Sequence, residues 1–213
     1  MNEGAADVGE EPGAERPAAG GNRRALVLAA YARIATDGFE GLRTRDVAAD
    51  VGVNIGTLHY YFPTKEALIR AAVRHTTATF AATLSRHGTP ADQLRGHLEG
   101  LRHLLKTDRE LWAVLSEVAL RAARDDAIAE LVRQANDQWF AFLRRLVARG
   151  VDQGCLDGAL QPDGVAAALI AAIKGLSMPT GGSFQSERID QTIDQLERWL
   201  GLGVATPSEP RDG

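Results

Sequence analysis

The sequence predicts an all-α fold with a short N-terminal helix-turn-helix domain followed by a longer helical domain. Apolar residues recur at spacings of three and four along most of the chain, which is the period of an amphipathic helix. The alternation of apolar and polar residues that is typical of a half-buried strand is absent. The length of 213 residues suffices for one helical domain of ordinary size and a small one.

Both ends of the chain are predicted to lack packed structure. Residues 1–21 are rich in Gly, Ala, Pro and Glu, and they carry too few large apolar side chains to offset the entropy of ordering. Residues 201–213 mix Gly, Pro, Ser and charge, which is typical of a flexible tail. Between the tails, the sequence predicts a helix-turn-helix domain at 22–68 and a helical domain at 69–200.

The first two helices are predicted from their caps and stops. Asn22 is the predicted N-cap of the first helix, and Gly38 marks its end. Thr44 is the predicted N-cap of a second helix of barely two turns. Gly52 ends that helix, because glycine can turn the chain sharply at positive φ.

A third short helix is predicted at residues 55–62 behind Asn54 as its N-cap. Pro63 ends it, because the residue before a proline disfavours the helical region. Thr64 is the predicted N-cap of the next helix, which continues to a Gly-Thr-Pro break at 88–90. The two short helices and the turn between them predict a helix-turn-helix, a unit whose second helix enters the major groove of DNA.

The rest of the chain predicts further amphipathic helices. The segment 163–178 is rich in alanine and carries little charge, so we expect it to be buried against another helix or another subunit. In the last helix, apolar residues recur at spacings of four, three and four, which predicts a seam for a neighbouring helix. These helices are predicted at residues 94–106, 108–124, 126–154, 163–178 and 187–200.

Charge is distributed unevenly over a chain whose net charge is −4. Residues 1–20 carry five acids against one base, whereas residues 21–75 carry eight bases against five acids. The predicted helix-turn-helix therefore lies in a weakly basic segment, as phosphate binding requires.

Composition also indicates where the protein works. The single cysteine, Cys155, has no disulfide partner and no neighbours at metal-ligand spacing. No stretch approaches the roughly 20 uncharged apolar residues of a membrane span, and the N-terminus is acidic where a signal peptide would be basic. We therefore expect a cytoplasmic protein that binds neither a metal, a cofactor nor a membrane.

The segment 44–68, TRDVAADVGVNIGTLHYYFPTKEAL, closely resembles the DNA-binding motif of TetR-family regulators. The resemblance is strong over residues 22–75 and elsewhere rests on length, helical pattern and a final pair of helices. The sequence departs from the family pattern at two places. The family commonly has Ser followed by a residue such as Lys or Pro where this chain has Asn54-Ile55, and it usually has Tyr where this chain has His59. Asn54 keeps the capping chemistry, whereas Ile55 and His59 change which bases are read.

The resemblance implies particular contacts with DNA, and physical chemistry is consistent with them. Arg45 can donate two hydrogen bonds to guanine, and Ile55 and Thr57 can contact thymine methyl groups. The alternative is that these residues do not contact DNA. In that case Arg45 and Lys65 are ordinary solvated surface charges, and His59 is a structural or exposed residue. The implied contacts are to phosphates for Thr44, Tyr61 and Lys65 and to base edges for Arg45, Ile55, Gly56, Thr57 and His59, with Asn54 at the start of the reading helix.

The neighbouring aromatic residues are predicted to divide between packing and DNA contact. Adjacent residues on a helix point about 100° apart, so only one of Tyr60 and Tyr61 is expected to pack. We assign packing to Tyr60 and Phe62, and an outward direction to Tyr61.

The resemblance further implies a small-molecule effector, bound between the middle and the last helices, that moves two DNA-binding heads apart. Such coupling requires that the effector prefer the conformation that cannot bind DNA. Alternatively, the aromatic residues and Met178 are ordinary core residues and His103 and Glu117 lie on the surface, and none of the candidates identifies the ligand. The candidates are His103, Leu104, Trp112, Ser116, Glu117, Trp139, Phe140 and Met178.

A homodimer is expected, because two heads one helical turn apart on a near-palindrome bind DNA far better than one. The last two helices of each subunit are predicted to form a four-helix bundle, with Gly175 permitting close approach. Alternatively, these helices pack only within their own subunit. The predicted interface residues are Ala168, Ala172, Gly175, Ile189, Ile193, Leu196 and Leu200.

The sequence therefore favours a repressor that an effector releases from operator DNA. One alternative is an architectural or ligand-blind DNA-binding dimer. An all-helical enzyme is a remote alternative, because the sequence contains no Gly-rich phosphate loop, no His-Glu-x-x-His spacing and no recognisable nucleophile motif.

Overall fold

A computed structural model describes residues 19–84, 87–176 and 184–203, and within these ranges every regular element is an α-helix. The predicted all-α fold is therefore confirmed. The helices are α1 (Ala19–Gly41), α2 (Thr44–Asp50), α3 (Ile55–Tyr61), α4 (Lys65–Ala81), α5 (Pro90–Thr107), α6 (Arg109–Ala122), α7 (Asp126–Asp152), α8 (Pro162–Leu176) and α9 (Phe184–Trp199).

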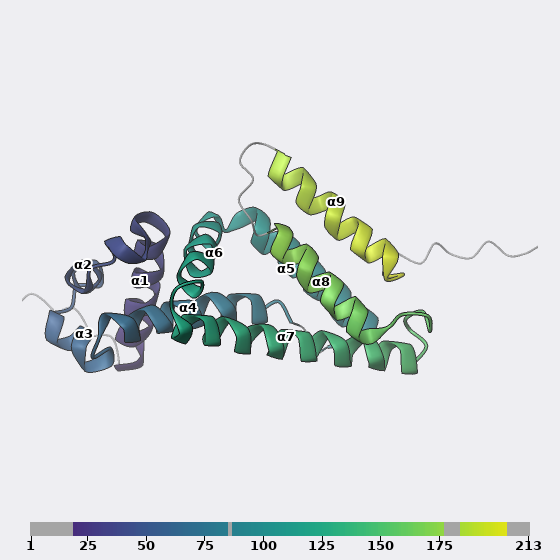
Figure 1. Cartoon of the computed structure of the whole chain (residues 1–213), viewed down its shortest axis with the longest axis horizontal. Coiled ribbons are helices and arrows are strands. Elements are labelled where there is room, and N and C mark those ends of the chain that lie inside the picture. The colour runs from purple at the N-terminus through teal and green to yellow at the C-terminus, as the bar shows by residue number, and fades with distance from the viewer. Residues whose placement is uncertain (1–18, 85–86, 177–183, 204–213) are drawn as a thin grey trace, which may run out of the picture.

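The molecule is elongated, as Figure 1 shows. Helices α1, α2 and α3 form one end, and α5, α8 and α9 pack together at the other. Helix α7 runs along the length between the two ends, while α4 and α6 join the first three helices to the rest. In the described part of the chain, no helix combines the length and the apolar composition needed to cross a bilayer.

The caps around α3 are confirmed. The Asn54 side-chain oxygen accepts a hydrogen bond from the Thr57 amide at 2.8 Å, and the Thr64 hydroxyl oxygen accepts one from the Ala67 amide at 3.1 Å. Each bond satisfies an amide that has no partner within its own helix. Together they fix where α3 and α4 begin. The turn before α3 is also as predicted, because Gly52 adopts a φ of 70°.

The caps predicted for the first two helices were wrong. Helix α1 already begins at Ala19, so Asn22 lies inside it and the predicted tail of 21 residues is too long by three. Helix α2 begins at Thr44, and its N-cap is Arg43, which makes no capping bond. A capping residue must adopt an extended backbone just outside the helix, and neither Asn22 nor Thr44 does so.

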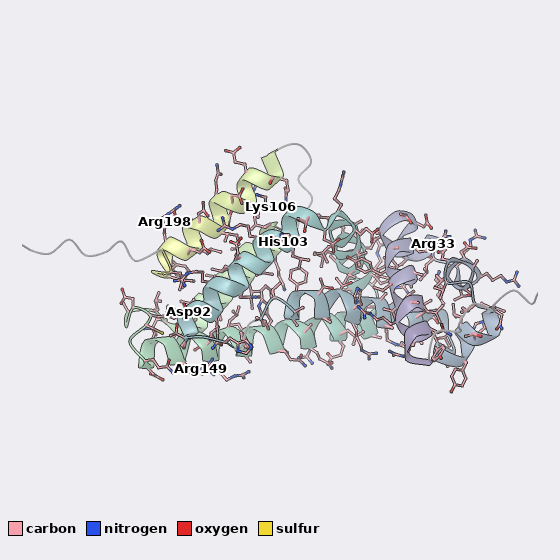
Figure 2. The ribbon with its side chains drawn as sticks, turned by 180° about the vertical axis from the view of Figure 1, so that it is seen from behind. Arg33, Asp92, His103, Lys106, Arg149 and Arg198 are labelled. Atoms are coloured by element: carbon pink, nitrogen blue, oxygen red, sulfur yellow. The ribbon has the colours of Figure 1, made fainter. Side chains whose placement is uncertain are left out.

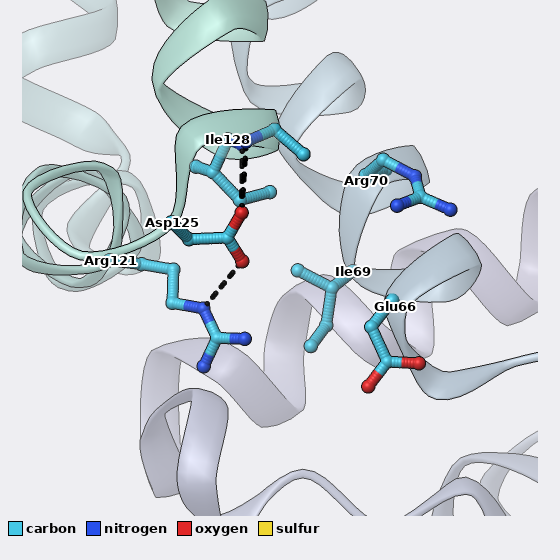
Figure 3. A pocket seen from close by; sticks show the side chains of 7 residues that line it. Glu66, Ile69, Arg70, Arg121, Asp125 and Ile128 are labelled. Carbon is cyan, nitrogen blue, oxygen red and sulfur yellow. Dashed lines mark hydrogen bonds and ion pairs between the residues drawn. The ribbon is translucent and has the colours of Figure 1, made fainter.

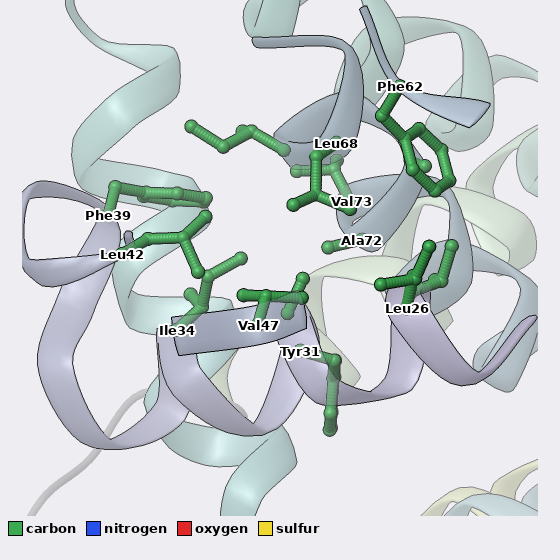
Figure 4. Packing of buried hydrophobic residues seen from close by; sticks show 14 of the residues in the cluster. Leu26, Tyr31, Ile34, Phe39, Leu42, Val47, Phe62, Leu68, Ala72 and Val73 are labelled. Carbon is green, nitrogen blue, oxygen red and sulfur yellow. The ribbon is translucent and has the colours of Figure 1, made fainter. Parts of the chain in front are cut away.

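The first hydrophobic core crosses the predicted boundary between the domains. Figure 4 shows side chains of this N-terminal core packed between α1, α2 and α4. Val114 and Val118 of α6 and Ile128 of α7 belong to the same core, so packing does not stop at residue 68. The N-terminal core comprises Leu26, Val27, Ala30, Tyr31, Ile34, Phe39, Leu42, Val47, Ala48, Leu58, Phe62, Leu68, Ile69, Ala71, Ala72, Val73, Val114, Val118 and Ile128.

The second hydrophobic core lies at the far end of the molecule and corrects the predicted dimer seam. Ile189, Ile193 and Leu200 are buried inside their own protomer, against α5 and α8, so they are not available to a second subunit. Leu196 packs at the edge of the same core. This C-terminal core comprises Leu94, Leu98, Leu101, Leu105, Leu143, Leu146, Val147, Leu156, Val165, Ala166, Leu169, Ile173, Leu176, Ile189, Ile193, Leu200 and Leu202.

The predicted C-terminal tail begins too early. Leu202 is buried in the C-terminal core, and its carbonyl accepts a hydrogen bond from Arg95 Nε at 2.9 Å. Within the predicted tail, Leu202 is therefore packed while Gly201 and Gly203 are exposed, and residues 204–213 and 1–18 lie outside the described residues.

Ion pairs attach α9 to α5 beside the C-terminal core. The half-buried Arg102 contacts Asp194 at 2.7 Å and Glu197 at 3.0 Å, both on α9. Lys106 pairs with Asp190 at 2.7 Å, and Figure 2 shows Lys106 beside α9. Because one guanidinium serves several carboxylates, α9 is held in one register on α5.

Candidate functional site

One face of α3 is open to solvent, while the opposite face is anchored in the N-terminal core. Leu58 is fully buried there, whereas Asn54, Gly56 and His59 are exposed and Ile55 is 37% exposed. Thr57 is half-buried, and its hydroxyl donates to the Asn54 side-chain oxygen at 3.1 Å. The structure thus brings four of the residues expected to face base edges together on one short helix, namely Ile55, Gly56, Thr57 and His59, whereas Arg45 lies on α2.

The two tyrosines of α3 have the opposite roles from those predicted. Tyr60 is 79% exposed, whereas Tyr61 is half-buried and packs against the N-terminal core. The two rings contact each other edge to face, with centroids 5.1 Å apart. Phe62 is buried as predicted, and the Arg23 guanidinium lies 5.3 Å from the centre of its ring. Tyr60 is therefore an exposed aromatic residue of α3, which the sequence pattern had assigned to packing.

Positive charge is available around this face. Arg43 and Arg45 are exposed and Lys65 is half-buried, and none of the three forms an ion pair within the part of the chain that the structure describes. Arg33, in contrast, is paired within the chain, because it donates two hydrogen bonds to Asp50, at 2.7 and 2.8 Å. That pair ties α1 to α2 and offsets the negative charge of Asp50.

The candidates for an effector site do not all meet. Trp112, Trp139 and Phe140 are half-buried, and each packs against the C-terminal core. The Trp112 indole donates to the Leu105 carbonyl at 2.9 Å. The Ser116 hydroxyl donates to the Trp112 carbonyl at 3.0 Å, and Leu104 is half-buried.

Two further candidates lie elsewhere. His103 is exposed on α5, and Glu117 contacts the end of α1 rather than the C-terminal core. Met178 lies outside the described residues. Neither His103 nor Glu117 is thus among the residues that pack against the C-terminal core.

A small cavity lies between α4 and the turn that joins α6 to α7 (Figure 3). Its volume of about 130 Å³ is below the roughly 300 Å³ at which pockets for drug-sized ligands begin. Asp125 on its wall accepts hydrogen bonds from the Ile128 amide and from Arg121 Nε, at 3.2 and 3.1 Å. We therefore regard this cavity as a small packing gap between helices rather than as the effector site.

His97 on α5 is a buried polar residue that the sequence did not single out. It is 1% exposed, and its Nε2 accepts a hydrogen bond from the Trp139 indole at 3.0 Å. Nδ1 then carries the proton and donates to the Thr83 hydroxyl oxygen at 2.7 Å, while that hydroxyl donates to the Phe80 carbonyl. The imidazole thereby links the end of α4 to α5 and α7.

This burial makes folding sensitive to acid. Loss of solvation on burial lowers the pKa of His97 to about 4, whereas a histidine in the unfolded chain titrates near ~6.5. The resulting stability is fully present above the unfolded pKa and is lost as the pH falls toward 4. Between pH 7 and pH 5 we expect a loss of about 2 kcal/mol in the free energy of unfolding that the variant His97→Gln does not show.

Urea unfolding at both pH values measures this difference. The control is His103→Gln, which removes an exposed imidazole from the same helix and should keep the wild-type pH dependence. Equal pH dependence in wild type and His97→Gln would contradict a neutral, buried His97.

Two sequence models of protein families match the chain. The model described as "Bacterial regulatory proteins, tetR family" matches residues 26–72, and the model described as "BetI-type transcriptional repressor, C-terminal" matches residues 90–202. The second match alone spans more than half of the chain. A search of curated proteins finds no match.

Solved structures share the fold over most of their length. A TetR-family regulator from Rhodococcus sp. has 22% identity and a TM-score of 0.70, covering 84% of this chain and 98% of its own. A TetR regulator from Haloarcula marismortui has 18% identity and a TM-score of 0.73, with coverages of 85% and 97%. A transcriptional regulator from Saccharomonospora viridis, solved in complex with choline, has 24% identity and a TM-score of 0.67, with coverages of 85% and 96%.

Proposed function

Because this chain belongs to the TetR family of transcriptional regulators, we propose that it represses transcription as a homodimer on operator DNA and leaves that DNA when a small-molecule effector binds. The chain is a DNA-binding regulator and not an enzyme. A regulator of this kind acts where the genome is, which supports a place in the cytoplasm.

The observation that supports specific DNA binding is the exposed face of α3, which we call the reading face. Leu58 and the Asn54 cap hold the helix in place, while Ile55, His59 and Tyr60 lie exposed on it. Their side chains offer apolar contact to thymine methyl groups and hydrogen bonds to base edges. Arg45 and Lys65 supply the charge for phosphates or guanine.

Selection from a pool of random duplexes tests this proposal. We expect the purified protein to enrich one near-palindromic sequence and to bind it about 10³-fold or more tighter than random DNA. Affinity should fall steeply with salt in a gel-shift series, because phosphate contacts release counterions. Equal affinity for selected and random duplexes would contradict the proposal.

Arg45 and Lys65 should affect DNA binding in different ways. We expect Lys65→Ala to weaken binding to every sequence and to reduce the salt slope by about 1, because a phosphate contact is lost. Arg45→Ala should cost about 1–3 kcal/mol on the selected duplex and relax the preference at one base pair. Titrations of selected and random duplexes separate the two effects.

The control for both variants is Arg149→Ala, which removes the same charge from an exposed position on α7, at the opposite end of the molecule from α3 (Figure 2). It should leave both affinities close to those of the wild type. The proposed division is wrong if Arg45→Ala and Lys65→Ala lower binding to selected and random DNA by the same factor.

Trp112, Trp139 and Phe140 all pack against the C-terminal core, and these aromatic residues support an effector site beside it. A regulator of the same fold was solved in complex with choline, and aromatic rings attract quaternary ammonium groups. Choline is therefore the first probe in a panel of small molecules, with tryptophan fluorescence and release of the selected duplex as the two readouts. Lack of any response across the panel would favour the alternative of a ligand-blind DNA-binding dimer.

The exposed side of α8 supports the homodimer. Along it, Ala171 and Gly175 are exposed, while Ala168 and Ala172 are half-buried. A helix face made of small residues allows the backbone of a second helix to approach closely. We propose that α8 and the outer side of α9 pair with those of a second subunit, while the inner side of α9 serves its own protomer.

A further inference from the structure

Helix α1 is broken just before the helix-turn-helix, and the break exposes a backbone donor. Gly38 adopts a φ of 68° and a ψ of 177°, values that interrupt the helix. The Phe39 amide at this break donates a hydrogen bond to Glu117 Oε2 on α6, 3.2 Å away. A residue of the helix that leads into α2 and α3 is thus bound by a side chain of the second domain.

The surroundings of this bond leave little freedom. A Cβ atom added to Gly38 would lie 3.1 Å from Glu117 Oε2, so the carboxylate is seated against the glycine. The Phe39 ring is buried in the N-terminal core together with Val114 and Val118, which lie on either side of Glu117 along α6. The Glu117 carboxylate is therefore expected to move with the backbone of α6, and the Phe39 amide is expected to move with the DNA-binding domain.

Helix α6 also contacts the far domain. Trp112, five residues before Glu117, packs against the C-terminal core and bonds the Leu105 carbonyl on α5. A shift of α5 or of the C-terminal core is therefore transmitted to α6. Beyond Glu117, Arg121 reaches Glu40 at 3.3 Å, but Glu40 is 93% exposed and this contact contributes little.

We propose that Glu117 is a positioning residue that couples the two domains, because its carboxylate holds the Phe39 amide so that α6 and the helix-turn-helix move together. The inference rests on the proposed DNA-binding function. Binding free energies couple reciprocally, so DNA bound to α3 must also change the behaviour of α6. This reciprocity allows a test that needs no effector.

Hydrogen exchange measures the coupling, with the duplex that the wild-type protein selects from a random pool as the probe. In the wild type, we expect duplex binding to slow the exchange of the amides in residues 109–122 by about fivefold or more. Glu117→Ala and Glu117→Asp should lose this response, since the first lacks the carboxylate and the second is one methylene too short. Glu117→Gln should retain it, because its amide oxygen still accepts from Phe39.

Two controls separate coupling from stability. Glu40→Gln removes the exposed carboxylate at the same contact between α1 and α6, and this variant should behave as wild type. Exchange of the Phe39 amide without DNA should be faster in Glu117→Ala than in Glu117→Gln, which tests the bond itself and identifies any variant that fails to fold.

The outcomes distinguish this inference from the function on which it rests. If Glu117→Ala and Glu117→Asp bind the duplex and still slow exchange in α6, Glu117 does not couple the domains. If no protein, wild type included, prefers the selected duplex, the proposed function itself is wrong, and the inference falls with it.

Discussion

Replacing Leu58 by alanine should cost about 2–5 kcal/mol in the free energy of unfolding and abolish specific DNA binding. Leu58 is fully buried and is the residue by which α3 is anchored in the N-terminal core. A cavity beneath so short a helix removes much of what fixes its position, so the reading face loses its orientation. Urea unfolding and titration with the selected duplex measure the two effects.

Ile55→Ala is the matched control on the same helix. Ile55 is largely outside the core, so its truncation should change stability by no more than about 0.5 kcal/mol. It should alter only the base preference, because the apolar contact to DNA is lost. If Leu58→Ala left both stability and specific binding intact, α3 would not depend on the N-terminal core as described.

Gly175→Arg should convert the homodimer to monomers and lower operator affinity by about 100-fold or more, because two linked half-site contacts become one. In the protomer, Gly175 is exposed and a Cβ atom there meets no atom within 4 Å, so a longer side chain can extend into solvent. Any loss of association therefore arises from the partner surface. Sedimentation velocity gives the oligomeric state, and gel shift gives the affinity.

Ile193→Ala is the contrasting variant, because Ile193 is fully buried within the protomer. It should lower the free energy of unfolding by about 2–5 kcal/mol while the dimer persists at neutral pH. The opposite result would be a stable monomer from Ile193→Ala and an intact dimer from Gly175→Arg. It would support the dimer interface along α9 that the sequence pattern predicts.

Local signals in the sequence predicted local structure well. The Asn54 and Thr64 caps and the Gly52 turn depend on chemistry within a few residues, and the structure confirms all three. Sequence alone therefore suffices to locate the recognition helix. Asn22 and Thr44 show the limit, because a capping residue type does not say whether the helix extends beyond it.

Periodicity predicted which faces are apolar, but not what they face. The regular spacing through Ile193 was correct as a helix face, yet that face packs on α5 and α8 and not on a second subunit. Tyr60 and Tyr61 differ by one position on a short helix, so pattern alone does not decide which one the core covers. Glu117 and His97 act through residues 78 and 42 positions away, a separation that no local signal can reveal.

The N-terminal core has a consequence for how such regulators can be recombined. Because Val114, Val118 and Ile128 complete a core begun by α1–α4, the first 68 residues are not a self-contained module. A chimera that grafts this head onto the body of another regulator must bring matching side chains from α6 and from the start of α7. Changes of operator preference on the surface of α3 can evolve freely, whereas exchange of whole heads requires coordinated change in both halves.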